Sequence, residues 1–273
     1  MRNLELNKSK LNRELFFERG WCRFDYDEDI ASWVEAVLPY AREAVFAKAN
    51  ARWLRCGGTW FAGVNVLPNQ PDGAVKNGPI LQGAVIDFIR QNLKPDPLVF
   101  DAAQVSVCYP GYPEPMDTES ENAFKFRRDR DAAHLDGLLR EGPDKRRHLR
   151  ECHGFVLGIP MVEFEQTASP LVVWEGSHEL VRAAMTTRFE GLQVSSWGDE
   201  DITECYHLLR QEIFDRCERV PVTAKPGEAY LIHRLALHGI SPWQEGAKAD
   251  TDGRMICYFR PDIGDVESWL FDP

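Results

Sequence analysis

Two histidines and an aspartate stand in an order that can build a metal site. His134 and Asp136 are separated by one residue, and His238 follows far downstream. Side chains two residues apart on a β-strand leave the same face, so we expect His134 and Asp136 to converge on one ion. Two imidazoles and one carboxylate form the facial triad that holds Fe(II) and leaves other coordination positions open for substrate chemistry. The pattern therefore predicts an Fe(II) site.

A second histidine, His233, competes with His238 for the third ligand position. Residues five apart on one regular strand face opposite ways, so only one of the two can reach the metal. His238 is followed by Gly239, where the backbone can turn tightly and place the imidazole at a strand end. We therefore predict His238 as the ligand and interpret His233 as a histidine on the outer face or behind the ligands.

An arginine beyond the distal histidine supplies a fixed cation. The guanidinium of Arg254 is a planar fork that suits a bidentate contact with a carboxylate. An iron site of this kind usually also needs such a cation for a dicarboxylate co-substrate, so Arg254 is the predicted anchor. Two alternatives stay open: Arg254 is a surface residue paired with Asp250 or Asp252, or Arg260 is the anchor instead.

The composition limits the class of protein. The chain has 273 residues, 44% of them hydrophobic, and a formal net charge of −11. This hydrophobic content allows a sizeable core, and the acidic balance disfavours nucleic-acid and anionic membrane partners, which need a basic surface. We find neither the apolar run of a signal peptide nor a stretch of ~20 apolar residues that could cross a bilayer. Seven cysteines without close pairs indicate reduced thiols, and together these features predict a cytoplasmic protein.

The elements that must position the site look helical first and β-rich later. Apolar residues recur at helical spacing over 30–45, where Pro39 should kink or break the helix, and again over 80–89. Strands are predicted at 100–108, 154–163, 171–174, 219–224, 228–233 and 255–259. We expect one α+β domain over 1–273, mainly β with flanking helices, in which a helical part at about 1–97 buttresses a cupin-like jelly roll at about 98–262 with a helical insertion at about 200–217.

Several motifs in this order resemble the phytanoyl-CoA dioxygenase-like branch of the Fe(II)/2-oxoglutarate oxygenases. The resemblance spans most of the chain, and the Gly176-Ser177-His178 element is its most specific part after the triad. The matching segments are 15–21, His134-Leu135-Asp136, 169–178, 226–230, His238-Gly239 and Arg254.

The resemblance implies a double-stranded β-helix, with iron on the three ligands named above and the distal carboxylate of 2-oxoglutarate on Arg254. It also implies contacts with this co-substrate from Gln104 and from the hydroxyl of Ser241 beside Arg254. The chain departs from the family pattern at Ile240, where Ser or Thr is common, and in the longer loop over 244–253.

A basic segment precedes the first two ligands. Arg127, Arg128 and Arg130 are close enough in sequence to the site to indicate an anionic substrate, a carboxylate or a phosphate. The competing interpretation is a solvated charge run that Asp129 and Asp131 neutralise.

The predicted activity is oxidation, with hydroxylation as the expected outcome, of a small organic substrate. Fe(II), 2-oxoglutarate and O2 would be the cofactors, with release of succinate and CO2. Two alternatives stay open: a cupin-like metal oxygenase or isomerase that does not use 2-oxoglutarate, and a non-enzymatic jelly-roll binding module. Arg254 separates the first two enzymes, because only an enzyme that uses 2-oxoglutarate needs a carboxylate anchor beside the metal. Iron binding separates both enzymes from the module.

Overall fold

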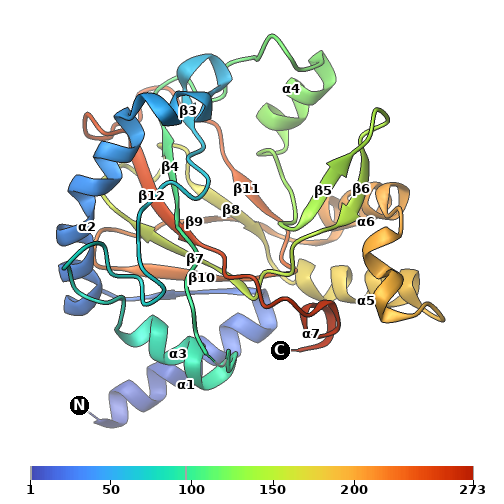
Figure 1. Ribbon diagram of the computed structural model, residues 1–273, viewed down its shortest axis with the longest axis horizontal. Coiled ribbons are helices and arrows are strands. Elements are labelled where there is room, and N and C mark those ends of the chain that lie inside the picture. The colour runs from blue at the N-terminus through green and yellow to red at the C-terminus, as the bar shows by residue number, and fades with distance from the viewer. Residues whose placement is uncertain (1, 96, 273) are drawn as a thin grey trace.

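Two antiparallel sheets form the centre of the protein (Figure 1). The computed structural model describes residues 2–95 and 97–272, with side chains from Ser9 onward. The larger sheet has the strand order β1-β10-β7-β12-β4-β3-β2, and the smaller one has the order β11-β8-β9. A separate hairpin pairs β5 with β6. The strands are β1 (Trp21–Phe24), β2 (Leu54–Arg55), β3 (Trp60–Phe61), β4 (Gln104–Cys108), β5 (Leu138–Glu141), β6 (Arg146–Leu149), β7 (Phe155–Pro160), β8 (Leu171–Trp174), β9 (Arg219–Val222), β10 (Ala229–His233), β11 (His238–Ile240) and β12 (Arg254–Phe259).

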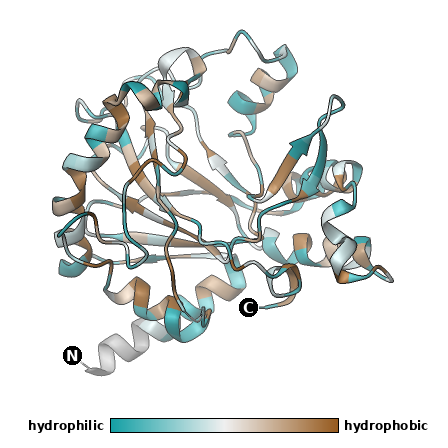
Figure 2. Cartoon of the chain, viewed as in Figure 1, coloured by the Kyte–Doolittle hydropathy of each residue, from teal (hydrophilic) through white to brown (hydrophobic). Residues whose placement is uncertain are grey.

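Helices cover the outside of these sheets. In Figure 2 hydrophobic residues follow the central strands, and hydrophilic residues gather on the outer surfaces of the helices and on the β5–β6 hairpin. The helices are α1 (Arg2–Arg19), α2 (Glu28–Phe46), α3 (Ala84–Asn92), α4 (Glu121–Asp129), α5 (Ser177–Phe189), α6 (Thr203–Arg216) and α7 (Val266–Phe271), with 3-10 turns η1 (Lys48–Trp53), η2 (Cys56–Gly58) and η3 (Val194–Asp199).

Strand β12 shows how the large sheet separates two apolar layers. Its residues Ile256 and Tyr258 pack between the two sheets, whereas Met255, Cys257 and Phe259 pack in the cluster under the N-terminal helices. Successive strand residues point to opposite faces, and here both faces are buried, so the strand reads as a continuous apolar run. The predicted α+β jelly roll with buttressing helices is confirmed, although the helices hold more residues than the strands.

Helix α2 does not end at Pro39, so a break at that proline is wrong. The helix begins at a strong cap, because the Asp27 carboxylate accepts a hydrogen bond from the backbone N–H of Asp29. Its apolar stripe, which includes Trp33 and Val37, is buried against the large sheet. This burial offsets the backbone hydrogen bond that proline removes from a helix interior.

The helical layer between the β8 and β9 strands is larger than predicted. Helix α6 occupies the expected region, but it is preceded by α5 and η3, which were not predicted from the sequence. The β5–β6 hairpin was also missed, because its sequence is rich in charged residues and lacks apolar alternation. The β5–β6 hairpin borders the site described below, because Leu138, Arg140 and Arg147 line its cavities.

Two further expectations concern thiols and membranes. All seven cysteines are free thiols, and Cys22, Cys56, Cys108 and Cys257 are buried. Among the residues that the structure describes, no helix is long and apolar enough to cross a bilayer.

Candidate metal centre and active site

His134 and His238 face each other across two paired chain segments. The backbone N–H of His134 donates to the carbonyl of His238 at 2.8 Å, and that of His238 donates back to His134 at 3.1 Å. Residues that exchange both bonds in an antiparallel pair place their side chains on the same face. Accordingly, the centroids of the two imidazole rings are 4.7 Å apart.

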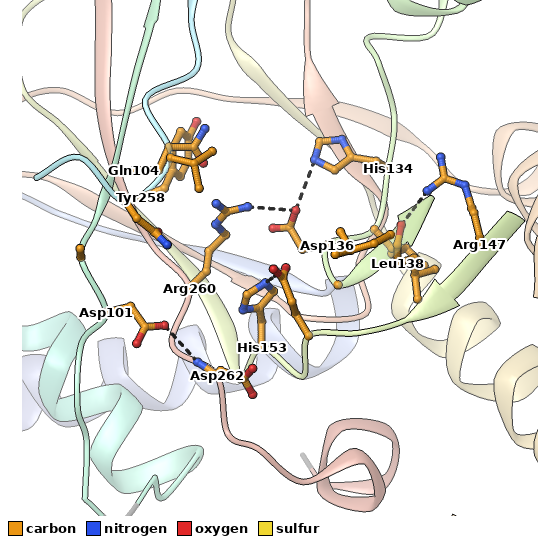
Figure 3. Close-up of a pocket in the computed structure, with 17 residues that line it drawn as sticks. Asp101, Gln104, His134, Asp136, Leu138, Arg147, His153, Tyr258, Arg260 and Asp262 are labelled. Atoms are coloured by element: carbon orange, nitrogen blue, oxygen red, sulfur yellow. Dashed lines mark hydrogen bonds and ion pairs between the residues drawn. The ribbon is translucent and has the colours of Figure 1, made fainter. Parts of the chain in front are cut away.

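Asp136 completes the cluster from a turn. A strand through His134 and Asp136 was predicted, and this is wrong: His134 forms a single isolated bridge, and Asp136 begins a turn that continues through Gly137 at φ 82°. The carboxylate still points at both imidazoles, with Oδ1 3.4 Å from Nε2 of His134 (Figure 3) and Oδ2 3.6 Å from Nε2 of His238. The convergence expected from the sequence is present, but a turn produces it.

Both histidines present the same ring nitrogen to the carboxylate. Nδ1 of His134 lies 2.9 Å from the carbonyl oxygen of Ala132, and Nδ1 of His238 lies 2.9 Å from that of Ala236. A carbonyl oxygen only accepts, so each Nδ1 carries a proton, and each Nε2 is the ring nitrogen that faces the carboxylate. Metal-binding histidines typically anchor their other nitrogen in this way.

The spacing of these atoms fits a single metal ion. One ligand atom from each of His134, Asp136 and His238 can be chosen so that all three lie within 4.8 Å of one another. Atoms about 2.1 Å from one metal and at right angles to each other lie ~3 Å apart, so small side-chain rotations close the site. The donor set, two nitrogens and one oxygen, is the one that suits Fe(II).

Gly239 permits the close approach that pairs the two histidines. A Cβ at this position would lie 2.1 Å from the carbonyl oxygen of Asp131. The sequence predicts a tight turn at Gly239, but the residue lies within strand β11 and its φ is not in the left-handed region. The glycine is needed for space instead.

We expect the substitution Gly239→Ala to weaken the metal site and the fold together. The added methyl group must push the backbone segment at Asp131 away, which costs about 1–3 kcal/mol of stability, or ~2–10 °C in melting temperature. Thermal melts with and without Fe(II) measure both effects. Gly198→Ala is the matched control, because its Cβ would meet nothing closer than 3.4 Å. Equal melting temperatures for the two variants would contradict this explanation.

Arg260 contacts the carboxylate of the cluster. Its Nη1 donates to Oδ1 of Asp136 at 3.2 Å. Burial alone would raise the pKa of Asp136, but the charge of Arg260 and the two histidines hold this pKa well below its ordinary value. Arg260 was the alternative anchor for a co-substrate, and the structure places it against the candidate ligand instead.

Arg254 lies inside the jelly roll with most of its donors free. The residue is 1% exposed, and its Nη2 donates to the hydroxyl of Tyr258 at 2.9 Å. Nε and Nη1 are buried and have no hydrogen-bond partner among the described residues. Asp252 pairs with Arg42 instead, so the interpretation of Arg254 as a surface residue paired with a nearby aspartate is wrong.

A tyrosine pair holds Arg254 in place. The hydroxyl of Tyr230 donates to that of Tyr258 at 3.0 Å, and Tyr258 accepts from Arg254. Both tyrosines oppose Gly158 on strand β7, where a Cβ would lie 2.1 Å from the ring of Tyr230. The absence of a side chain at Gly158 therefore makes room for the ring that fixes Tyr258.

The other two residues proposed for the co-substrate have partners of their own. Ser241 accepts a hydrogen bond from Arg219 at 3.0 Å, so its hydroxyl does not serve as the partner of Arg254 in this structure. Gln104 lines the cavity beside the cluster, near Tyr258 (Figure 3), and donates to the carbonyl of Ala62 at 2.7 Å.

One polar residue near Arg254 was not foreseen. Ser169 is fully buried, and its hydroxyl has no nitrogen or oxygen partner among the described residues. Ser169 and Arg254 both lie beside the thiol of Cys108, whose pKa burial raises to about 12. The sequence signal was present, because Ser169 opens the matched segment over 169–178, but nothing in it pointed to Arg254.

The candidate ligands open into a cavity between the sheets. A cavity of about 470 Å³ reaches all three of them, and an adjoining one of about 390 Å³ shares His134, Asp136 and Arg260 with it. The first is lined by Arg55, Trp60, Ala62, Val64, Gln104, Ser106, Tyr112, Arg127, Ala132, His134, Asp136, Arg140, Val156, Leu171, His238, Gly239, Ile240, Tyr258 and Arg260.

Only one of the three arginines proposed for the substrate lines this cavity. Arg127 does so, and it pairs with Glu119. Arg128 is half-exposed and pairs with Asp129, and the guanidinium of Arg130 lies 4.8 Å from the ring of Phe214. The structure therefore places Arg127 at the cavity and the other two away from it.

His233 belongs to a buried structural cluster. Its Nδ1 accepts from the backbone of Leu235 at 3.0 Å, and its Nε2 lies 3.2 Å from Arg182. Its ring packs against that of His178, with centroids 4.9 Å apart, and burial lowers the pKa of His233 well below its ordinary value. These contacts occupy both ring nitrogens.

Comparisons with known proteins give structural neighbours at low sequence identity. No family model matches the chain, and no curated protein matches it. EvdMO1 shares 13% identity at a TM-score of 0.48, covering 93% of this chain and 50% of its own, so this chain spans half the length of that neighbour. The non-heme alpha ketoglutarate dependent epimerase SnoN from nogalamycin biosynthesis shares 13% sequence identity at a TM-score of 0.45. The match covers 98% of this chain and 90% of SnoN. EctD from S. alaskensis, solved with 2-oxoglutarate and 5-hydroxyectoine, shares 14% sequence identity at a TM-score of 0.41. The match covers 91% of this chain and 74% of EctD.

Proposed function

We propose that this chain is an Fe(II)/2-oxoglutarate-dependent oxygenase of the phytanoyl-CoA dioxygenase-like type. His134, Asp136 and His238 would hold the iron, and Arg254 would bind the distal carboxylate of 2-oxoglutarate. Iron, 2-oxoglutarate and O2 together supply the oxidant, with release of succinate and CO2. The substrate is a small organic molecule, and hydroxylation is the proposed outcome. The seven free thiols support the cytoplasmic location that the sequence predicts.

The observation that carries this proposal is the pair of free donors on Arg254. A buried donor without a partner is costly, and a buried guanidinium without an anion is more so. A carboxylate that accepts from Nη1 and from the second N–H of Nη2 would make the end-on bidentate contact that the guanidinium fork suits, and it would satisfy one of the two free donors. Strand alternation puts Arg254 on the same face of β12 as Ile256 and Tyr258, which pack between the two sheets, and Tyr258 lines the cavity that reaches the candidate ligands.

The remaining residues would orient the reactants. Tyr258 holds the guanidinium of Arg254 through its hydroxyl, and the free hydroxyl of Ser169 is a candidate second donor to the same carboxylate. Gln104 sits at the cavity wall beside Tyr258. We propose Ser169 in the role that the resemblance assigned to Ser241.

Each of the two alternative functions fails to explain one feature of the site. A cupin-like enzyme that works without 2-oxoglutarate gives no reason for the free donors of Arg254. A non-enzymatic binding module gives no reason for two imidazoles that direct Nε2 toward one carboxylate.

Calorimetry under anaerobic conditions tests the co-substrate. 2-Oxoglutarate should bind at least about tenfold more tightly in the presence of Fe(II) than in its absence, because one end chelates the metal and the other binds Arg254. Succinate, which lacks the 2-oxo group, should gain little from the metal. Binding of 2-oxoglutarate that does not respond to Fe(II) would contradict the proposal.

A further inference from the structure

The cavity at the candidate ligands has a basic lining, although the chain as a whole is acidic. The whole chain carries a formal net charge of −11. The cavity that reaches all three ligands is nevertheless lined by four arginines and a single carboxylate, Asp136. The arginines are Arg55, Arg127, Arg140 and Arg260.

Two of these arginines are compensated by carboxylates. Arg260 pairs with Asp136, and Arg127 pairs with Glu119. Within the described chain, Arg55 and Arg140 have no carboxylate partner. They come from different elements, Arg55 from strand β2 and Arg140 from the β5–β6 hairpin.

Further positive charge lies behind Arg140. Arg147 is the direct cross-strand partner of Arg140. The charge of Arg210, on α6, acts on Arg147 as the charge of Arg140 does. Arg147 and Arg210 both rest on the ring of Tyr206, at 4.7 Å each, and neither has a carboxylate partner among the described residues. Burial and the neighbouring arginines lower the pKa of each.

Arg55 and Arg140 are both exposed, and Arg140 lies beside another positive charge. Like charges directly opposite each other on paired strands are destabilising, and Arg140 faces Arg147 in this way. Metal and co-substrate would not neutralise these arginines. The formal charges of Fe(II), Asp136, Arg260, Arg254 and doubly ionised 2-oxoglutarate sum to +1, so Arg55 and Arg140 remain uncompensated beside a loaded centre.

We propose that the substrate is an anion whose carboxylate or phosphate group is bound by Arg140 and Arg55, with Arg147 and Arg210 adding positive potential behind Arg140. This inference rests on the proposed oxygenase function and names its substrate class. The cavity of about 470 Å³ suits a small molecule, with the apolar walls of Trp60, Val156 and Leu171 available to the rest of it.

Matched small probes test the charge requirement. Benzoate and phenyl phosphate carry the two candidate anionic groups on one ring, and benzamide is their neutral counterpart. Each is titrated by calorimetry, without oxygen, into protein saturated with Fe(II) and 2-oxoglutarate. At least one anion should bind about tenfold or more tightly than benzamide. Preference for benzoate indicates a carboxylate substrate, and preference for phenyl phosphate indicates a phosphate; both support the proposal.

Variants assign the effect to the named residues. Arg140→Gln and Arg55→Gln should each weaken binding of the preferred anion about tenfold, because each removes one charge-assisted contact. Arg146→Gln is the matched control: it lies next to Arg147 on the same hairpin but pairs with Asp201. Arg146→Gln should bind the preferred anion as tightly as the wild type does. Equal binding of benzamide and both anions, or unchanged anion affinity in both site variants, would overturn the proposal.

Loading the protein with Fe(II) and 2-oxoglutarate first distinguishes failure of the proposed function from failure of the proposed substrate class. If the protein fails to bind Fe(II) and 2-oxoglutarate, the proposed function itself is wrong. If it loads normally but binds anions no better than benzamide, only the substrate class is wrong. Unchanged 2-oxoglutarate affinity in Arg140→Gln and Arg55→Gln confirms that these variants are folded.

Discussion

Replacing His238 with alanine should abolish tight Fe(II) binding while leaving the fold intact. The imidazole contributes one of three ligand atoms, and its loss should weaken Fe(II) affinity at least about 100-fold, more than the loss of a residue behind the ligands does. The backbone of residue 238 keeps its two hydrogen bonds to His134, so the paired segments should hold. Anaerobic competition with a chelator measures the affinity.

The control for this variant is His207→Ala. His207 is an exposed residue on α6 and does not belong to the cluster, so its removal should leave Fe(II) affinity unchanged. Wild-type Fe(II) affinity in His238→Ala would mean that other residues hold the metal, and the proposed ligand set would be wrong.

Replacing Arg254 should separate co-substrate binding from metal binding. Arg254→Gln removes the charge that a buried carboxylate would pair with, and such a loss costs about 2–4 kcal/mol, or ~30- to 1000-fold in 2-oxoglutarate affinity. Fe(II) affinity should not change, because Arg254 is not among the candidate ligands. Arg254→Lys keeps the charge but loses the planar fork, so its affinity for 2-oxoglutarate should fall between those of the wild type and Arg254→Gln. Anaerobic calorimetry with 2-oxoglutarate gives all three values.

Arg42→Gln is the matched control for Arg254. Arg42 pairs with Asp252, is half-exposed and does not line the cavity, so its removal should not affect 2-oxoglutarate. If Arg254→Gln bound 2-oxoglutarate as tightly as Arg42→Gln does, the free donors would serve another ligand. The alternative of a metal enzyme that works without 2-oxoglutarate would then be favoured.

The parts of the fold that the sequence predicted well are those whose pattern is local. Strand β8 (Leu171–Trp174) was predicted to the residue, because a short apolar run between turn signals has few other interpretations. The β5–β6 hairpin was missed because charged residues dominate it and leave no apolar alternation to mark its strands.

The site shows the same division. The grouping of His134, Asp136 and His238 followed from residue types and order, but the turn that positions Asp136 did not. The partner of Ser241 is Arg219 on β9, which lies in the same sheet as β11 with β8 between them, and residue spacing does not contain this strand order. The convergence of Arg55 and Arg140 on one cavity joins segments far apart in sequence, so no local motif announces it.

The most direct test of the central claim is visible spectroscopy of the protein with Fe(II), under anaerobic conditions, before and after 2-oxoglutarate is added. A 2-oxo acid chelated to Fe(II) gives a metal-to-ligand charge-transfer band. We predict that this band appears with the wild type, is lost in His134→Ala, and needs more 2-oxoglutarate in Arg254→Gln. Iron binding without the band would contradict the use of 2-oxoglutarate, and absence of iron binding would contradict the metal centre itself.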